Sequence, residues 1–151
     1  MSHKQSEDNS WITGWIEVWG NSIVKYAFSI VLSESVAQDI SQEAFRRLNK
    51  AHKQDPSHVF DPAWLFSVTR TLAIGRIESR RAVFVNDDER EANSRNTLPV
   101  WHQIDPLDRE AVWLFYYQRW PIKRIALHSN QSVEEVRSRL FRTQQRLDGL
   151  T

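Results

Sequence analysis

The chain has 151 residues, of which 40% are hydrophobic, 11% aromatic and 26% charged, a composition that suits one ordinary domain or two very small ones and excludes a wholly disordered chain. No apolar run reaches the about 18 residues of a membrane span, and no cysteine is present for disulfides or thiolate metal sites. Four glycines without a GxGxxG or GxxxxGK[ST] string argue against a phosphate-binding loop. Because the first ten residues are polar and hold no apolar signal segment, we expect a cytoplasmic, helical protein.

The net charge of +1 conceals an uneven distribution along the chain. Residues 63–81 hold four arginines and one acid, and residues 121–151 hold six basic and three acidic side chains. Between them, residues 86–110 hold seven acids and three bases. Two basic blocks separated by an acidic one indicate two surfaces that face a polyanion, although solvated helix faces with ordinary ion pairs give the same pattern.

Helical periodicity predicts three helices in the first half of the chain. The first spans about residues 10–32 and the second about 35–50, and a loop at 52–60 follows. A third helix begins at Asp61-Pro62, since aspartate caps free backbone amides and proline fits a first turn. Its apolar side chains point inward and its arginines outward.

A polar, acidic stretch at residues 83–97 lacks helical periodicity and has the composition of a linker. The short apolar run 83–85 favours a docked segment as the alternative. The acids Asp87, Asp88, Glu89 and Glu91 suggest the further hypothesis that the linker covers a basic face of the free protein.

Three more helices are predicted in the second half, at about residues 105–118, 121–128 and 132–148. The last begins with a capping box from Ser132 to Glu135, and Asn130 in the preceding turn tolerates a left-handed backbone. A helix, a short turn and a capped basic helix are typical of a helix-turn-helix, whose second helix enters the major groove. Many small bundles share the pattern without binding DNA.

The first half resembles sigma region two in two strings, DISQEAFRR at 39–47 and WLFSVTRTLA at 64–73. The second half resembles sigma region four in LDREAVWL at 107–114 and VRSRLFR at 136–142. The order and spacing of the two regions, with almost nothing between them, are similar to those of extracytoplasmic-function (ECF) sigma factors. This resemblance covers nearly the whole chain.

The resemblance implies an all-α fold of two small helical lobes. A region 2 bundle of three helices would span residues 10–82 and a region 4 helix-turn-helix residues 98–151, joined by the short linker at 83–97. It also implies a bacterial sigma factor that binds core RNA polymerase, at the clamp helices of the largest subunit and the flap region, and directs promoter recognition and transcription initiation. Promoter DNA and an anti-sigma protein are the other implied partners, and no cofactor is implied.

The resemblance assigns site residues to three surfaces. On the second helix, the residues that bind core polymerase would be Asp39, Gln42, Glu43, Phe45 and Arg46. The minus-ten element would be bound by the following loop and the third helix, through Lys53, Ser57, His58, Arg70, Arg76, Arg80 and Arg81. The minus-thirty-five element would be bound through Lys123, Arg124, Arg137, Ser138, Arg139 and Arg142.

The chemistry of these side chains suits the assigned roles. The second helix presents a mixed hydrogen-bonding face that fits an arginine-rich partner helix, although an exposed polar face needs no partner. Loop polar groups can bind a flipped base while arginines hold the strand, and Trp64 is either a stacking platform or a core anchor. On the last helix, Glu134 and Glu135 support the cap, or accept from a cytosine amino group.

Several residues depart from the family pattern. Thr71 and Gly75 stand where the family usually has Asn and Asp, and Arg124 where it usually has Glu. Ser129 and Gln131 are polar where the turn is usually apolar, so this lobe is expected to be less stable or to bind a partner. The tryptophans of the first helix either fill the core or dock an inhibitor.

Catalytic and metal sites are not expected. His52 and His58 lie near Asp55 and Asp61, which allows a metal site, but solvated loop histidines are the simpler interpretation. No nucleophile, base and acid are arranged together, so we expect no enzyme. Besides the sigma factor, two hypotheses remain: a helix-turn-helix regulator that acts without polymerase, and a sigma-like adaptor that binds only polymerase or an anti-sigma protein.

Overall fold

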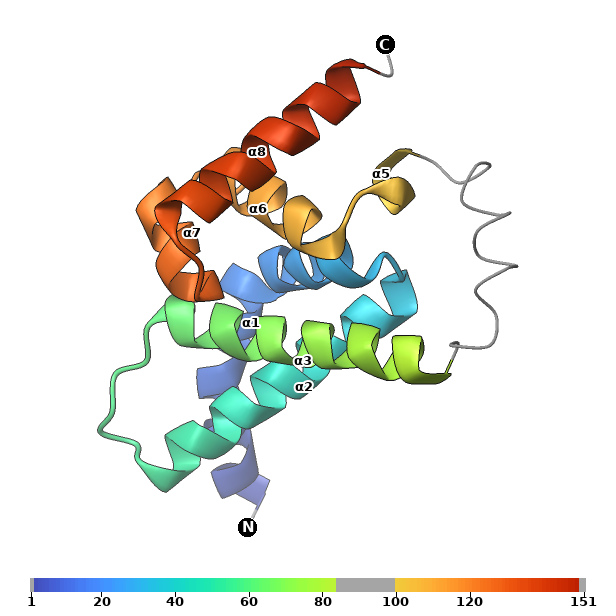
Figure 1. Cartoon of the computed structure of the whole chain (residues 1–151). Helices are drawn as coiled ribbons and strands as arrows, with labels where there is room; N and C mark the ends of the chain where they lie inside the picture. Colours follow the sequence, from blue (N-terminus) through green and yellow to red (C-terminus); the bar gives the residue numbers. More distant parts are fainter. Residues whose placement is uncertain (1, 84–99, 150–151) are drawn as a thin grey trace. The chain divides into compact units, whose positions relative to one another are not determined.

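The structure is a computed structural model that describes the backbone of residues 2–83 and 100–149 and the side chains of residues 10–80 and 100–149 (Figure 1). The described residues form α-helices joined by turns, without a strand, which confirms the expected all-α fold. The chain divides into two compact units, Met1–Ile74 and Gly75–Thr151, and the division falls within one helix. Each unit is described by itself.

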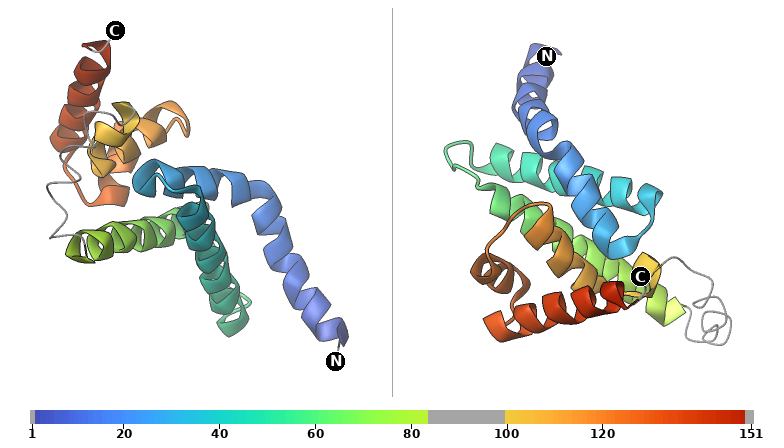
Figure 2. Two further views of the ribbon diagram at one scale, coloured as in Figure 1. Left: turned by 90° about the vertical axis from the view of Figure 1, so that its right-hand side faces the viewer. Right: turned by 90° about the horizontal axis from the view of Figure 1, so that it is seen from above.

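The first unit contains α1 (Ser2–Val31), α2 (Glu34–Gln54) and the start of α3 (Pro62–Val83). The first helix begins eight residues before the predicted position, and it bends along its course (Figure 2). The N-cap of α2 is Ser33, which was not predicted. Its hydroxyl accepts a hydrogen bond from the Val36 amide at 3.4 Å.

Helix α2 also ends later than predicted. It continues past residue 50 to Gln54 because no helix-breaking residue occurs before Asp55-Pro56. The loop is therefore shorter, from residue 55 to residue 61, and His52 and Lys53 belong to the last turn of α2. Asp61 caps α3 as predicted, accepting a hydrogen bond from the Ala63 amide at 2.8 Å.

The core of the first unit lies where α1 and α2 pack together. Buried aliphatic and small side chains fill this interface, namely Ile23, Ala27, Ile30, Ala37, Ile40, Ala44 and Leu48. Aromatic rings join the start of α3 to α1, since Phe66 lies 5.3 Å from the ring of Tyr26 and 6.0 Å from that of Trp19. Trp11, Trp15 and Trp19 are only half-buried, so they close the edge of this core rather than fill its centre.

The second unit contains α5 (Val100–Gln103), α6 (Pro106–Tyr116), α7 (Ile122–Ser129) and α8 (Val133–Asp148). Its last three helices confirm the three helices predicted there, while the short α5 was not predicted. Asp105 caps α6, accepting from the Leu107 amide at 2.9 Å. Helix α6 stops at Tyr116, two residues before the predicted end, and Arg119 then takes a left-handed backbone with φ of 57°.

The helix-turn-helix is built around a small apolar core. Leu114 of α6, Ile125 and Ala126 of α7 and Val136 of α8 are buried, as the apolar spacing predicts. Trp120, in the turn before α7, is buried as well. The inner side of α8 therefore packs against both α6 and α7, and its opposite side is exposed.

Most of the predicted linker lies outside the residues that the structure describes. Residue 83 ends α3, and the rest of the predicted linker, with its docked-segment alternative and the four acids of the covering hypothesis, lies outside the described residues. Within the part of the chain that the structure describes, no helix combines the length and apolar character needed to cross a membrane.

Candidate polymerase and nucleic-acid interfaces

The candidate partner surface on α2 is a mixed polar face. Asp39, Gln42 and Arg46 are exposed, and Glu43 is half-buried. Phe45 is 5% exposed and lies behind this face, where it belongs to the core of the first unit. Four of the five predicted residues therefore lie on one accessible face, and the fifth supports it from within.

Glu43 is held by two arginines of its own helix. Its carboxylate accepts a hydrogen bond from Arg47 Nε at 3.0 Å and another from Arg46 Nη2. The hydrogen bond from Arg47 lowers the pKa of Glu43, against the opposing effect of desolvation, and Arg46 lowers it further. Glu43 and Arg46 were both predicted to contact the partner, and the structure joins them with Arg47 in one ion-pair cluster.

The loop before α3 is folded on itself. Ser57 Oγ donates to Asp55 Oδ1 at 2.8 Å, and the His58 amide donates to the Asp55 carbonyl at 3.1 Å. The predicted loop residues Ser57 and His58 are exposed, and so is Lys53 in the last turn of α2. These three side chains thus lie within a few residues of one another at one end of the first unit.

An aromatic cluster anchors this loop. The rings of Trp11 and His52 stack with centroids 3.7 Å apart, and Phe60 lies 6.2 Å from Trp11 and 5.5 Å from Trp64. Trp64 is half-buried, a position compatible with both of its predicted roles. His52 is engaged in this stack, and no group of three His, Asp or Glu side chains that could hold a metal ion occurs among the described residues.

The structure confirms the predicted outward position for two of the four arginines of α3. Arg76 and Arg80 are exposed and Arg70 is half-buried, while the side chain of Arg81 lies outside the described residues. Thr71 donates to the Ser67 carbonyl at 3.1 Å, a local contact within the helix. A positively charged stripe on this helix therefore rests on the arginines, without a contribution from Thr71.

The turn of the helix-turn-helix is stabilised by polar side chains. Asn130 adopts the left-handed conformation, with φ of 54° and ψ of 45°. Ser129 Oγ donates to the Ile125 carbonyl at 2.7 Å, and Gln131 Nε2 donates to Ser129 Oγ at 2.9 Å. Ser132 caps α8 as predicted, accepting from the Glu135 amide at 3.1 Å. Ser129 and Gln131 thus form hydrogen bonds in place of the apolar contacts typical of the family.

The candidate DNA-binding arginines of α8 have different surroundings. Arg137 and Ser138 are exposed on the outer side of the helix. Arg139 and Arg142, in contrast, both bind the carboxylate of Asp108 from α6. This carboxylate was not among the predicted site residues, because the contact joins residues more than thirty positions apart and only the tertiary fold brings them together.

On α7, Lys123 is exposed, and Arg124 lies over the ring of Trp120, 3.9 Å from its centroid. This cation–π contact fixes the guanidinium where the family usually has an acid. In α6, the buried Arg109 donates from Nη1 to the carbonyl of Ile104, which lies just before the helix. Burial lowers the pKa of Arg109 to about 10, against the opposing charge of Asp105.

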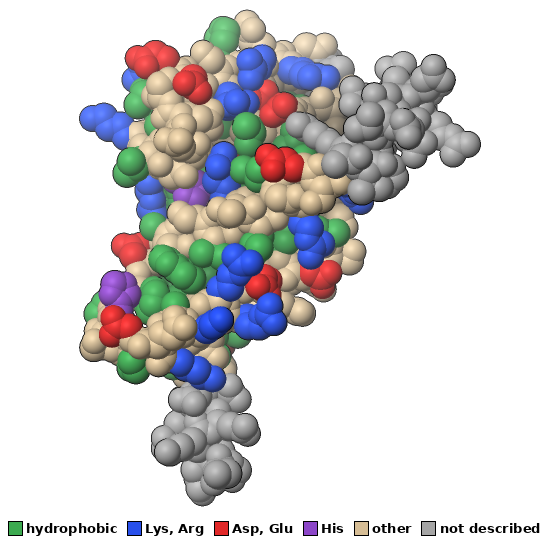
Figure 3. Space-filling model, turned by 60° about the horizontal axis from the view of Figure 1, so that its bottom comes forward, with side chains coloured by type: hydrophobic (Ala, Val, Ile, Leu, Met, Phe, Trp, Pro, Cys, Tyr) green, Lys and Arg blue, Asp and Glu red, His purple; other side chains and the backbone are tan. Residues whose placement is uncertain are grey.

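Basic and acidic side chains are mixed on the molecular surface. Figure 3 shows a face on which Lys and Arg lie among Asp and Glu instead of forming one continuous basic field. The carboxylates of Glu43 and Asp108 each pair with two arginines.

Comparisons with known proteins relate the chain to sigma factors. Residues 15–83 match the model of the family Sigma-70 region 2. The chain is 27% identical over 151 residues to the ECF RNA polymerase sigma factor SigM of Bacillus subtilis (strain 168), across 89% of this chain and 91% of that protein.

Two solved structures share the fold along most of the chain. The sigma factor RpoE of Bartonella quintana, solved in complex with the anti-sigma factor NepR, has a TM-score of 0.68 at 16% identity and covers 91% of this chain and 94% of its own. CnrH, solved in complex with the cytosolic domain of CnrY, has a TM-score of 0.62 at 24% identity. The match covers 92% of this chain and 86% of CnrH.

Residues 15–83 thus match sigma-70 region 2, and the chain shares the fold of the sigma factor RpoE along most of its length. Its similarity to the ECF sigma factor SigM agrees with the family that the motifs at 39–47 and 64–73 suggested.

Proposed function

We propose that this protein is a sigma factor that binds core RNA polymerase and directs promoter recognition and transcription initiation. The observation that carries the proposal is the polar face of α2, where Asp39, Gln42 and the Glu43 cluster lie side by side within the matched region 2. Such a face supplies oriented, charge-assisted hydrogen bonds to a helical partner. The role requires no catalytic group from this chain.

Two further surfaces fit promoter DNA. The ring of His58 lies 4.7 Å from that of Phe60 in the aromatic cluster, and Lys53 and Ser57 are exposed a few residues away along the chain. This combination suits an unstacked strand with a flipped base. In the second unit, the exposed side of α8 presents Arg137 and Ser138 to the major groove. We assign these surfaces to the minus-ten and minus-thirty-five elements.

We propose the cytoplasm as the location of the free chain. An anti-sigma protein is a further proposed partner. The similar fold of RpoE, which binds the anti-sigma factor NepR, supports this proposal.

Co-migration with core RNA polymerase from the protein's own source tests the proposal. We expect the full chain to co-migrate, and the variant Asp39→Ala, Gln42→Ala, Glu43→Ala to be lost from the complex. The matched control is Glu134→Ala, Gln145→Ala, Asp148→Ala on α8, which also removes two acids and one amide and should still co-migrate. A folded wild-type chain that does not co-migrate contradicts the proposal and leaves a helix-turn-helix regulator as the next candidate.

A further inference from the structure

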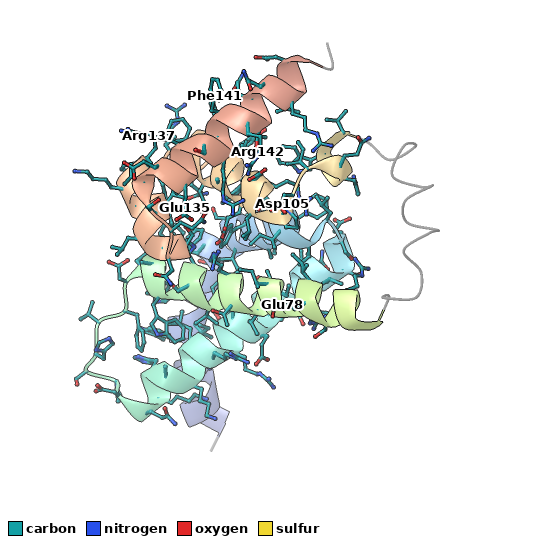
Figure 4. All side chains as sticks on the ribbon, in the orientation of Figure 1. Glu78, Asp105, Glu135, Arg137, Phe141 and Arg142 are labelled. Carbon is teal, nitrogen blue, oxygen red and sulfur yellow. The ribbon has the colours of Figure 1, made fainter. Side chains whose placement is uncertain are left out.

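One carboxylate binds two arginines of the candidate recognition helix. Asp108 lies in the first turn of α6, and its side chain is 8% exposed. Its Oδ1 accepts from Arg139 Nη1 at 2.7 Å and from Arg142 Nη2 at 2.8 Å, and its Oδ2 accepts from Arg142 Nε and Nη2, each at 3.2 Å. Figure 4 shows Arg142 on the side of α8 that faces α6, with Arg137 and Phe141 turned away.

The two arginines differ in what remains accessible. The side chain of Arg139 is 21% exposed, and it also donates from Nε to Gln131 Oε1 at 2.6 Å, so it fastens α8 to the turn. The side chain of Arg142 is 60% exposed. Asp108 occupies only its Nε and Nη2 edge, and within the described residues no hydrogen bond uses its Nη1 group.

We propose that Asp108 is a positioning residue for DNA recognition, which fixes Arg142 so that its remaining donors meet paired acceptors on the DNA. A guanidinium has five N–H donors in a rigid fork, so one edge can bind a carboxylate while the other binds a second partner. Because the side chain is ordered before DNA arrives, less rotamer freedom is lost on binding. This inference rests on the proposed DNA-binding role of α8.

Guanine O6 and N7, or two phosphate oxygens, are the acceptor pairs that such an edge fits. A contact to a base and a contact to phosphate predict different effects on DNA binding when the contact is removed. A base contact sets the preference at one base pair, and its loss relaxes that position alone. A phosphate contact contributes to affinity on every sequence, and its loss lowers the salt dependence of binding.

The test uses the full chain bound to core polymerase and a pool of DNA duplexes with one randomised segment. Duplexes are selected separately with wild type, Asp108→Asn, Arg142→Gln and the double variant. The affinity of each protein for the duplex that wild type selects is then measured as a function of KCl concentration. We expect both single variants to show the same defect and the double variant to be no worse than either.

For a base contact, the defect is a loss of about tenfold in preference at one base pair. For a phosphate contact, affinity falls on all sequences and the slope of log affinity against log salt becomes shallower by about 0.9. Either pattern supports the inference when Asp108→Asn and Arg142→Gln share it. A purely structural role of Asp108 would weaken all base preferences together and would not match the Arg142→Gln pattern.

Asp148→Asn is the matched control, since it removes one negative charge from the same unit at the exposed last residue of α8. Its base preferences should equal those of wild type, and its affinity for DNA should be unchanged or higher. If Asp108→Asn does not fold, Asp108→Glu keeps the carboxylate and should retain the wild-type preference, in contrast to Arg142→Gln. A variant Asp108→Glu that folds and loses the preference counts against the inference.

Three results overturn it: Asp108→Asn behaving as wild type, Asp108→Asn binding DNA more tightly than Asp148→Asn does, or additive defects in the double variant. The second would mean that Asp108 withholds Arg142 from DNA. A wild-type complex that selects no sequence overturns the proposed DNA-binding role itself, and this inference with it.

Discussion

At the scale of single residues, local chemistry predicted several positions correctly. Asn130 was expected to tolerate a left-handed backbone, and it has one, because its short polar side chain is compatible with positive φ. Ser132 and Asp61 were expected as caps, and both accept the hydrogen bond of a free amide. Such features depend on neighbours within a few residues, which the sequence contains.

Contacts between distant residues could not be predicted in this way. Arg139 and Arg142 have the spacing of an outward basic face, and nothing near them in the sequence marks Asp108 as their partner. The pair forms because α6 and α8 pack against each other, so the contact is a property of the tertiary fold. The stack of His52 on Trp11, which joins α2 to α1, was missed for the same reason.

The backbone of Asn130 predicts how substitutions there change stability. Asn130→Ala should lower the free energy of unfolding by about 1 kcal/mol, because alanine has a Cβ and no side-chain hydrogen bond to offset a positive φ. Asn130→Gly should be neutral or slightly stabilising, since glycine adopts this conformation without strain. Chemical denaturation of both variants measures the effect, and equal stabilities for the two would contradict it.

The ion pairs of Glu43 predict its titration. Its pKa lies below the ordinary value of 4.5, so the folded protein binds this proton less readily than the unfolded chain. The resulting contribution to stability is present above pH 4.5 and is lost as the pH falls through the lower folded pKa. NMR titration should show the pKa of Glu43 rising towards 4.5 in Arg47→Ala, whereas an unchanged pKa would mean that Arg47 does not hold the carboxylate.

At the scale of helices, the starts marked by a capping residue were predicted well, whereas α1 begins eight residues before its predicted start and α2 ends four residues after its predicted end. Asp61 and Ser132 lie at the beginnings of α3 and α8, as their capping chemistry requires. The end of α2 was placed too early, since the residues from Ala51 to Gln54 carry no stop signal of their own. This extension matters for function, because it moves Lys53 from the loop to a helix.

The first helix contains a glycine with room for a side chain. Gly14 is exposed within α1, and no atom lies within 4 Å of a Cβ built there. Gly14→Ala should therefore raise the free energy of unfolding by about 0.5–1 kcal/mol, because alanine loses less backbone entropy in a helix.

Thermal or denaturant unfolding measures this gain. The control is Gly149→Ala, just after α8, where a Cβ would lie 3.3 Å from the Gln145 carbonyl oxygen and no gain is expected. A Gly14→Ala variant that is no more stable than wild type would show that the glycine is needed for the conformation of α1.

At the scale of the whole molecule, sequence motifs predicted the family and the all-α fold. The match of residues 15–83 to sigma-70 region 2 and the shared fold of RpoE and CnrH agree with the two motif groups. Charge counting was a weaker guide. Residues 121–151 hold six basic side chains, but two of them share the carboxylate of Asp108 outside that block, so the count within the block omits a negative charge that lies against α8.

The most direct test of the central claim is transcription from genomic DNA of the source organism, with core RNA polymerase in the presence and absence of the full chain. We predict that transcripts begin at a discrete set of positions only when the chain is present, and that the Asp39→Ala, Gln42→Ala, Glu43→Ala variant abolishes them. Start positions identical to those of core polymerase alone, with wild-type protein that is folded and bound to the enzyme, would contradict the assignment as a sigma factor.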